Sequence, residues 1–78
     1  MIIDPVRIDA RGMRCPWPAL RAAKAMRAAD RVMIWADDPN APKELAALAA
    51  SGWRLTDIAD PLGPCFLIEK ENIVKTVL

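Results

Sequence analysis

One cysteine of this sequence stands in a setting suited to chemistry. Cys15 lies in the run Arg-Cys-Pro-Trp-Pro, directly before a stretch that favours a helix. The free N–H groups and the dipole at a helix N-terminus favour an anion, and Arg11 and Arg14 add positive charge nearby in the sequence. We therefore expect the pKa of the Cys15 thiol to fall from about 8.5 to roughly 3.5–7.5. The same groups are expected to stabilise a persulfide anion on this sulfur.

The competing interpretation of Cys15 is inert packing, which is the fate of most free cysteines. Two prolines, Pro16 and Pro18, fix the backbone beside it, and such rigidity favours a functional position over a filler. Cys65 is the opposite case, because it alternates with Phe66 and Ile68 at the start of an expected strand. Its simplest role is that of a small apolar side chain, and a resolving thiol for Cys15 is the alternative.

The sequence contains no histidine and only two cysteines among 78 residues. These counts exclude a Cys-His dyad, a Ser-His-Asp triad and the common zinc sites within this chain. We expect neither a metal nor a cofactor. In a reducing compartment both cysteines should be free thiols.

Positive charge gathers around Cys15 although the net charge is only +1. Between residues 10 and 31 one acid, Asp30, faces six cations: Arg11, Arg14, Arg21, Lys24, Arg27 and Arg31. The simplest interpretation of such a run is a solvated helix face. The net positive charge of the chain is too small for nucleic acid to be the primary ligand, and direct binding of nucleic acid is not expected.

A second feature of the same helix is a pair of large apolar residues within its polar face. At about 100° per residue, one polar stripe is formed by Arg21, Lys24 and Arg27. Leu20 projects into the middle of this stripe, and Trp17 projects beside it. Apolar groups among basic residues, next to a reactive thiol, favour a surface that docks a partner protein. The alternative, equally weighted, is that Trp17 folds back over the loop as part of the core.

Hydrophobic periodicity predicts an α+β fold in the order β-α-β-α-β-β. We expect strands over residues 6–9, 32–36, 53–59 and 65–69, and helices over 19–29 and 42–51. Pro16 and Pro18 belong to the first turn of the first helix, Asn40 or Asp38 is expected to cap the second, and Gly52 is expected to end it. The economical packing is a two-layer α/β sandwich: a four-stranded mixed sheet with both helices on one face.

The whole chain, residues 1–78, is expected to form one small domain, with residues 72–78 too few to assign. No run of 18 uncharged apolar residues is present, so no membrane span is expected. We also see no signal peptide. We therefore expect a cytoplasmic protein.

The run from Ile8 to Pro18 resembles the signature of the TusA/SirA sulfur-carrier family almost residue for residue. The segment Ala-Asp-Asp-Pro that ends at Pro39 is similar to the family's acidic turn after its second strand, and Gly52 takes the place that closes its second helix. The similarity extends over roughly residues 6–70. The chain differs from the family pattern at Trp17, at Trp53 in place of a common histidine, and at Glu44-Leu45-Ala46 in place of Asp-Ile-Pro.

This resemblance implies a two-layer sandwich whose Cys15 accepts sulfane sulfur and passes it on. The donor it implies is a cysteine desulfurase or a rhodanese, and the acceptor a DsrE-like or other sulfur-accepting protein. The associated pathways are 2-thiouridine synthesis in tRNA, sulfur oxidation and molybdenum-cofactor synthesis. It also assigns partner contact to Asp38, and a carrier that docks with several proteins in turn is expected to be a monomer.

Two other functions remain open from the sequence. A non-catalytic regulatory module would use Trp17, Leu20 and the basic stripe to bind a partner and would not need the thiol. A thiol redox protein would pair Cys15 with Cys65, which requires their Cα atoms to lie within about 7 Å. The label of enzyme is uncertain, because a carrier turns over only with its partners.

Overall fold

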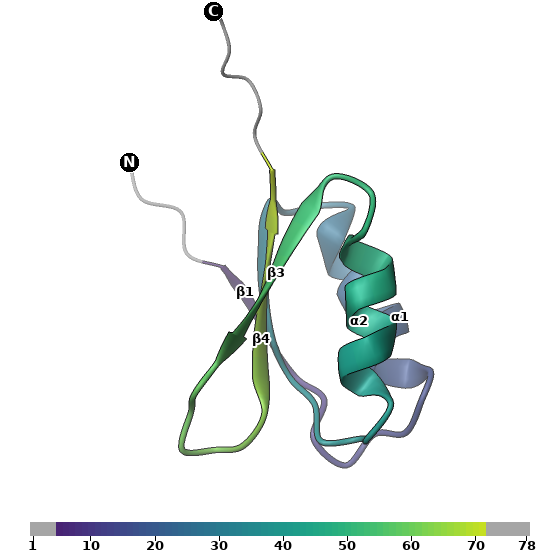
Figure 1. Ribbon diagram of the computed structural model, residues 1–78, viewed down its shortest axis with the longest axis vertical. Helices are drawn as coiled ribbons and strands as arrows, with labels where there is room; N and C mark the ends of the chain where they lie inside the picture. The colour runs from purple at the N-terminus through teal and green to yellow at the C-terminus, as the bar shows by residue number, and fades with distance from the viewer. Residues whose placement is uncertain (1–4, 72–78) are drawn as a thin grey trace, which may run out of the picture.

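The computed structural model describes residues 5–71 of the chain. Within this range the strands are β1 (Val6–Asp9), β2 (Arg31–Trp35), β3 (Trp53–Ile58) and β4 (Cys65–Lys70), and the helices are α1 (Trp17–Met26) and α2 (Ala41–Ala49). The predicted order β-α-β-α-β-β is confirmed (Figure 1). Residues 72–78, which the sequence left unassigned, lie outside the described residues.

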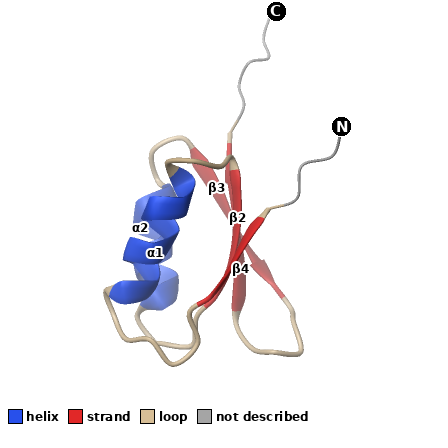
Figure 2. Cartoon of the chain, turned by 180° about the vertical axis from the view of Figure 1, so that it is seen from behind, coloured by secondary structure: helices blue, strands red, loops and turns tan. Residues whose placement is uncertain are grey.

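The sheet is mixed and open, with the strand order β1-β2-β4-β3. β1 pairs with β2 in parallel, while β4 runs antiparallel to both β2 and β3. Both helices cover the same face of this sheet, so the molecule has two layers (Figures 1 and 2). The predicted α+β sandwich is therefore confirmed.

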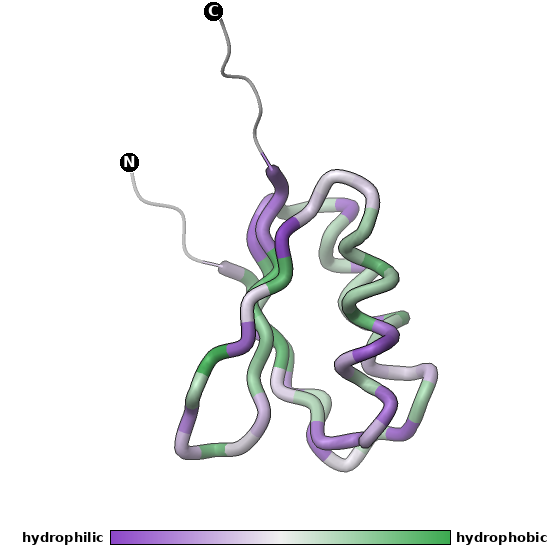
Figure 3. Tube along the Cα trace, in the orientation of Figure 1, coloured by the Kyte–Doolittle hydropathy of each residue, from purple (hydrophilic) through white to green (hydrophobic). Residues whose placement is uncertain are grey.

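The core lies between these layers and follows from the alternation of the central strands. Val32 and Ile34 of β2 and Ile68 of β4 are fully buried on the helix side, and Leu45 of α2 packs with them. Figure 3 shows hydrophobic residues along the middle of the strands, and hydrophilic residues at the upper ends of the strands, on the helices and in the loops below the helices. This apolar contact fixes the distance of both helices from the sheet.

The first helix differs from its predicted bounds of 19–29 at both ends. It begins at Trp17, with Pro16 at the N-cap position and Pro18 in the first turn. Residues 27–28 form a turn, in which the Ala28 N–H donates to the Ala25 carbonyl at 3.0 Å. High helix propensity in an alanine-rich tail is not enough to continue a helix after its packing face has ended.

The second helix also ends earlier than predicted, at Ala49, and Gly52 follows with a φ of +92°. This left-handed conformation suits glycine and turns the chain into β3. Asn40 occupies the N-cap position but makes no capping hydrogen bond through its side chain. The carbonyl of Asp38 instead accepts the Ala41 N–H at 2.9 Å, so the side-chain cap expected from the sequence is wrong.

The topology brings two loops to one end of the molecule. Because β1 and β2 are parallel neighbours, the loops that follow them leave the same end of the sheet. Both loops run below the helices, toward the N-termini of α1 and α2 (Figures 1 and 2). The β1–α1 loop carries Cys15, and the β2–α2 loop carries Asp37 and Asp38.

Candidate functional site

The loop that carries Cys15 is held by the acidic turn after β2. The Gly12 N–H donates to Asp37 Oδ1 at 2.9 Å, and the Cys15 N–H donates to Asp38 Oδ2 at 3.3 Å. Gly12 has a φ of +83°, a conformation that glycine adopts without steric cost. Two carboxylates therefore fix the loop from a segment more than twenty residues away in the sequence.

The half-buried Cys15 lies just before α1, as the sequence predicts. The backbone donors expected around it are fewer than a helix N-terminus normally offers. Pro16, which follows a cis peptide bond, and Pro18 have no N–H, and the Trp17 N–H donates to the Arg14 carbonyl at 2.9 Å. The prolines that shape this loop thus remove donors that were expected to stabilise an anion.

The nearest charged partner of Cys15 is a carboxylate from α2. The Cys15 Sγ–H donates to Glu44 Oε2. This hydrogen bond to Glu44, together with desolvation and the negative charges of Glu44 and Asp38, raises the pKa of Cys15 to about 11. The expectation of a lowered thiol pKa is therefore wrong for this structure, because acids rather than arginines surround the sulfur.

The two arginines predicted beside the thiol have other surroundings. The Arg11 guanidinium forms an ion pair with Asp9 at 2.8 Å and donates to both of its carboxylate oxygens. This pairing lowers the pKa of Asp9 to about 2. Arg14 is exposed and lines a surface cleft together with Asp37 and Asp38. A role of either arginine in stabilising a persulfide stays a prediction.

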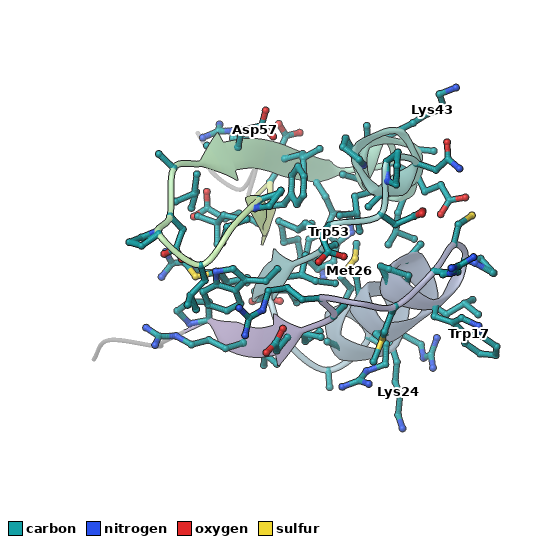
Figure 4. All side chains as sticks on the ribbon, turned by 90° about the horizontal axis from the view of Figure 1, so that it is seen from below. Trp17, Lys24, Met26, Lys43, Trp53 and Asp57 are labelled. Atoms are coloured by element: carbon teal, nitrogen blue, oxygen red, sulfur yellow. The ribbon has the colours of Figure 1, made fainter. Side chains whose placement is uncertain are left out.

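The residues expected to dock a partner form an exposed face of α1, and their role in docking stays a prediction. Trp17 is 59% exposed and Leu20 is 51% exposed, so the interpretation of Trp17 as folded-back core is wrong. Figure 4 shows Trp17 projecting outward at one end of the molecule and Lys24 projecting outward from the same helix. Arg21 is also exposed. We call Trp17, Leu20, Arg21 and Lys24 the α1 surface.

Asp38, predicted to contact a partner, is half-buried and directs its carboxylate to the Cys15 N–H. Through this contact Asp38 positions the loop that carries Cys15. Its part in partner binding stays a prediction.

Cys65 is buried, with 2% of its surface exposed, and burial raises the pKa of its thiol. It pairs with Trp35 of β2 and Ile58 of β3. Its strand neighbour Phe66 belongs to the core on the helix side, so Cys65 points to the opposite face of the sheet. Cys15 lies at the helix layer, and both cysteines are free thiols. The sheet thus stands between the two sulfurs, which favours the packing role predicted for Cys65.

Among residues 5–71 no group of three or more His, Cys, Asp or Glu side chains could hold a metal ion. In the same range, no helix has the length and apolar character needed to cross a membrane.

The chain is similar to known proteins in sequence and in fold. Residues 6–70 match the model of the family described as sulfurtransferase TusA. The chain belongs to the TusA family. Its fold is also similar to the crystal structure of a SirA-like protein from Desulfitobacterium hafniense, with a TM-score of 0.69 and 24% identity over 83% of this chain and 95% of that one. No curated protein matches the chain.

The TusA match includes all of the predicted site residues and one that the sequence argument missed. Glu44 follows Cys15 by 29 positions and meets it only because α1 and α2 pack side by side. The one signal in the sequence is the family resemblance: the TusA pattern has an acid at this place in its second helix, and Glu44 keeps an acid there.

Proposed function

We propose that this TusA-family protein carries sulfane sulfur as a persulfide on Cys15. The observation that carries the proposal is the position of Cys15: a half-buried thiol on a firmly held loop, within the part of the chain that matches a family of sulfurtransferases. A thiol at the end of a helix, beside the exposed α1 surface, is accessible to a docked protein. It does not need a pocket for a small substrate.

The proposed donor is a cysteine desulfurase or a rhodanese, and the proposed acceptor is a DsrE-like or other sulfur-accepting protein. These partners would dock on Trp17, Leu20, Arg21 and Lys24, which are exposed on the helix that follows Cys15. The sulfur would then serve tRNA 2-thiouridine synthesis or related sulfur trafficking in the cytoplasm. The carrier itself acts as a monomer without a cofactor.

A second candidate function is a non-catalytic module that binds a partner through the α1 surface. The observation that favours it is the hydrogen bond that the Cys15 thiol donates to Glu44. This contact raises the pKa of Cys15 to about 11, which leaves little thiolate near pH 7. The two functions differ in their need for the thiol. A binding module tolerates Cys15→Ser, whereas a carrier does not.

The test is intact mass spectrometry after incubation with a cysteine desulfurase and cysteine. The wild type should gain the mass of one sulfur, and a reductant should remove it. Cys15→Ser should gain nothing under the same conditions. Absence of the adduct on the wild type, with this donor and with thiosulfate plus a rhodanese, would favour the binding module.

A further inference from the structure

A carboxylate from α2 controls the environment of the Cys15 sulfur. Glu44 Oε2 accepts the thiol hydrogen bond, and its second oxygen, Oε1, is buried without a hydrogen-bond partner. Glu44 lies in the first turn of α2, where the helix dipole stabilises a negative side chain. The carboxylate of Glu44 is therefore held in direct contact with the sulfur.

The shared proton belongs to the sulfur. Carboxylic acids ionise near about pH 4.3 and thiols near about 8.5, so a carboxylate is by far the weaker base of the two. Asp38, from the β2–α2 loop, adds a second negative charge near Cys15. On the β1–α1 loop itself, Arg11 is engaged by Asp9. Glu44 is thus too weak a base to activate the thiol, and its charge opposes formation of a thiolate.

We propose that Glu44 keeps Cys15 as a neutral, unreactive thiol in the free carrier, and that loading requires this contact to be broken or its charge neutralised by the docked donor. The proposal rests on the carrier function above, and it adds that the Cys15 thiol of the free carrier is kept from reacting. A thiolate is the form that attacks sulfur, so a free carrier with a neutral thiol is protected from oxidants and from small sulfur compounds. Glu44 is a positioning residue in this scheme, since it acts through Cys15.

The transfer step balances without an external oxidant. The Cys15 thiolate attacks the terminal sulfur of the donor persulfide, and a new bond forms between Sγ and that sulfur. The sulfur–sulfur bond of the donor breaks, and its electron pair leaves on the donor thiolate. This thiolate takes up the proton that Cys15 gave up, so a thiol and a persulfide exchange places.

The first test is the rate of alkylation of Cys15 by iodoacetamide between pH 6 and 10, followed by mass spectrometry and assigned by peptide mapping. With a thiol pKa of about 11, the wild-type rate should still rise about tenfold per pH unit at the upper end of this range. Glu44→Gln should react at least about tenfold faster at pH 7.5 and reach its plateau at a lower pH, because removing the charge lowers the thiol pKa.

Matched variants separate this effect from general damage. Asp57→Asn removes an exposed carboxylate from β3 and should react like the wild type. Glu44→Ala should accelerate alkylation as Glu44→Gln does, and circular dichroism checks that each variant is folded. Should one Glu44 variant not fold, the other decides. Folded Glu44 variants that react no faster than the wild type would overturn the proposal.

A second readout uses glutathione persulfide, a small donor that cannot dock as a protein does. Glu44→Gln should accept sulfur from it at least about tenfold faster than the wild type at pH 7.5. Persulfide that forms on both proteins at equal rates would overturn the proposed restraint. Alkylation does not depend on sulfur carriage. Faster alkylation of Glu44→Gln, together with no persulfide on any variant from any donor, would therefore refute the carrier function and leave the control of the thiol by Glu44 supported.

Discussion

At the scale of single residues, the site depends on which charges face Cys15 in space. The arginines that precede it in the sequence gave the expectation of a low thiol pKa, yet Arg11 pairs with Asp9. Glu44 and Asp38 set the pKa instead. Nearness along the chain singled out Cys15 as the candidate residue but did not predict the protonation state of its thiol. That state depends on a carboxylate 29 positions away, which only the packing of α1 on α2 brings to the sulfur.

Cys65 gives the prediction that belongs to this scale. Cys65→Ala should lower the free energy of unfolding by about 1 kcal/mol, because it removes a buried sulfur from a packed position. Urea denaturation measures this loss. Persulfide loading of Cys15 should be unchanged. A variant that folds but no longer discharges or resolves its persulfide would mean that Cys65 is a second reactive thiol.

At the scale of elements, the sequence predicted every helix and strand because each has its own periodicity. The short apolar run of β2 and the alternation of β1 leave little choice of structure. Their ends were harder to predict, since the tail after Met26 has high helix propensity but forms a turn. The clamp of Asp37 and Asp38 on the Cys15 loop was not predicted, because it depends on the parallel pairing of β1 and β2.

Because Asp37 and Asp38 hold the loop that carries Gly12 and Cys15, we expect Gly12→Ala to have a specific effect. No atom lies within 4 Å of the added methyl group, and the strain comes from the φ of +83° alone. The change should cost about 1–2 kcal/mol of unfolding free energy, measured by urea denaturation, and slow the loading of Cys15. Gly52→Ala is the matched control, with a φ of +92° and equally open surroundings. It should lose similar stability and load normally; equal loading by both variants would contradict a role of the Gly12 loop in the site.

At the scale of the whole molecule, the residues of the candidate site gather at one end. The loops that carry Cys15 and Asp38 lie below the helices (Figure 1). Trp17, at the start of α1, projects outward at one end of the molecule (Figure 4). The β3–β4 loop extends away from the helix layer (Figure 2). Helical spacing predicted the α1 surface, because Trp17 and Leu20 fall among basic positions. The exposure of Trp17 could not be predicted from the sequence, since it depends on the direction of one side chain.

A double substitution tests the α1 surface as a docking site. Trp17→Ala with Leu20→Ala should leave stability within about 1 kcal/mol, as both side chains are largely exposed. The KM for loading by a cysteine desulfurase should rise about tenfold or more with little change in kcat, because exposed aromatic anchors dominate docking. Leu62→Ala, on the β3–β4 loop and 56% exposed, is the control. An unchanged KM in the double variant would place the docking surface elsewhere.

The most direct test of the carrier function is the count of transferable sulfur atoms on the chain. After incubation with a cysteine desulfurase and cysteine, the isolated protein is treated with cyanide, which removes sulfane sulfur as thiocyanate and leaves a thiolate. We expect about one thiocyanate per chain from the wild type and from Cys65→Ala, and none from Cys15→Ser. Thiocyanate from Cys15→Ser at the wild-type level, or none from the wild type, would contradict the assignment of Cys15 as the sulfur carrier.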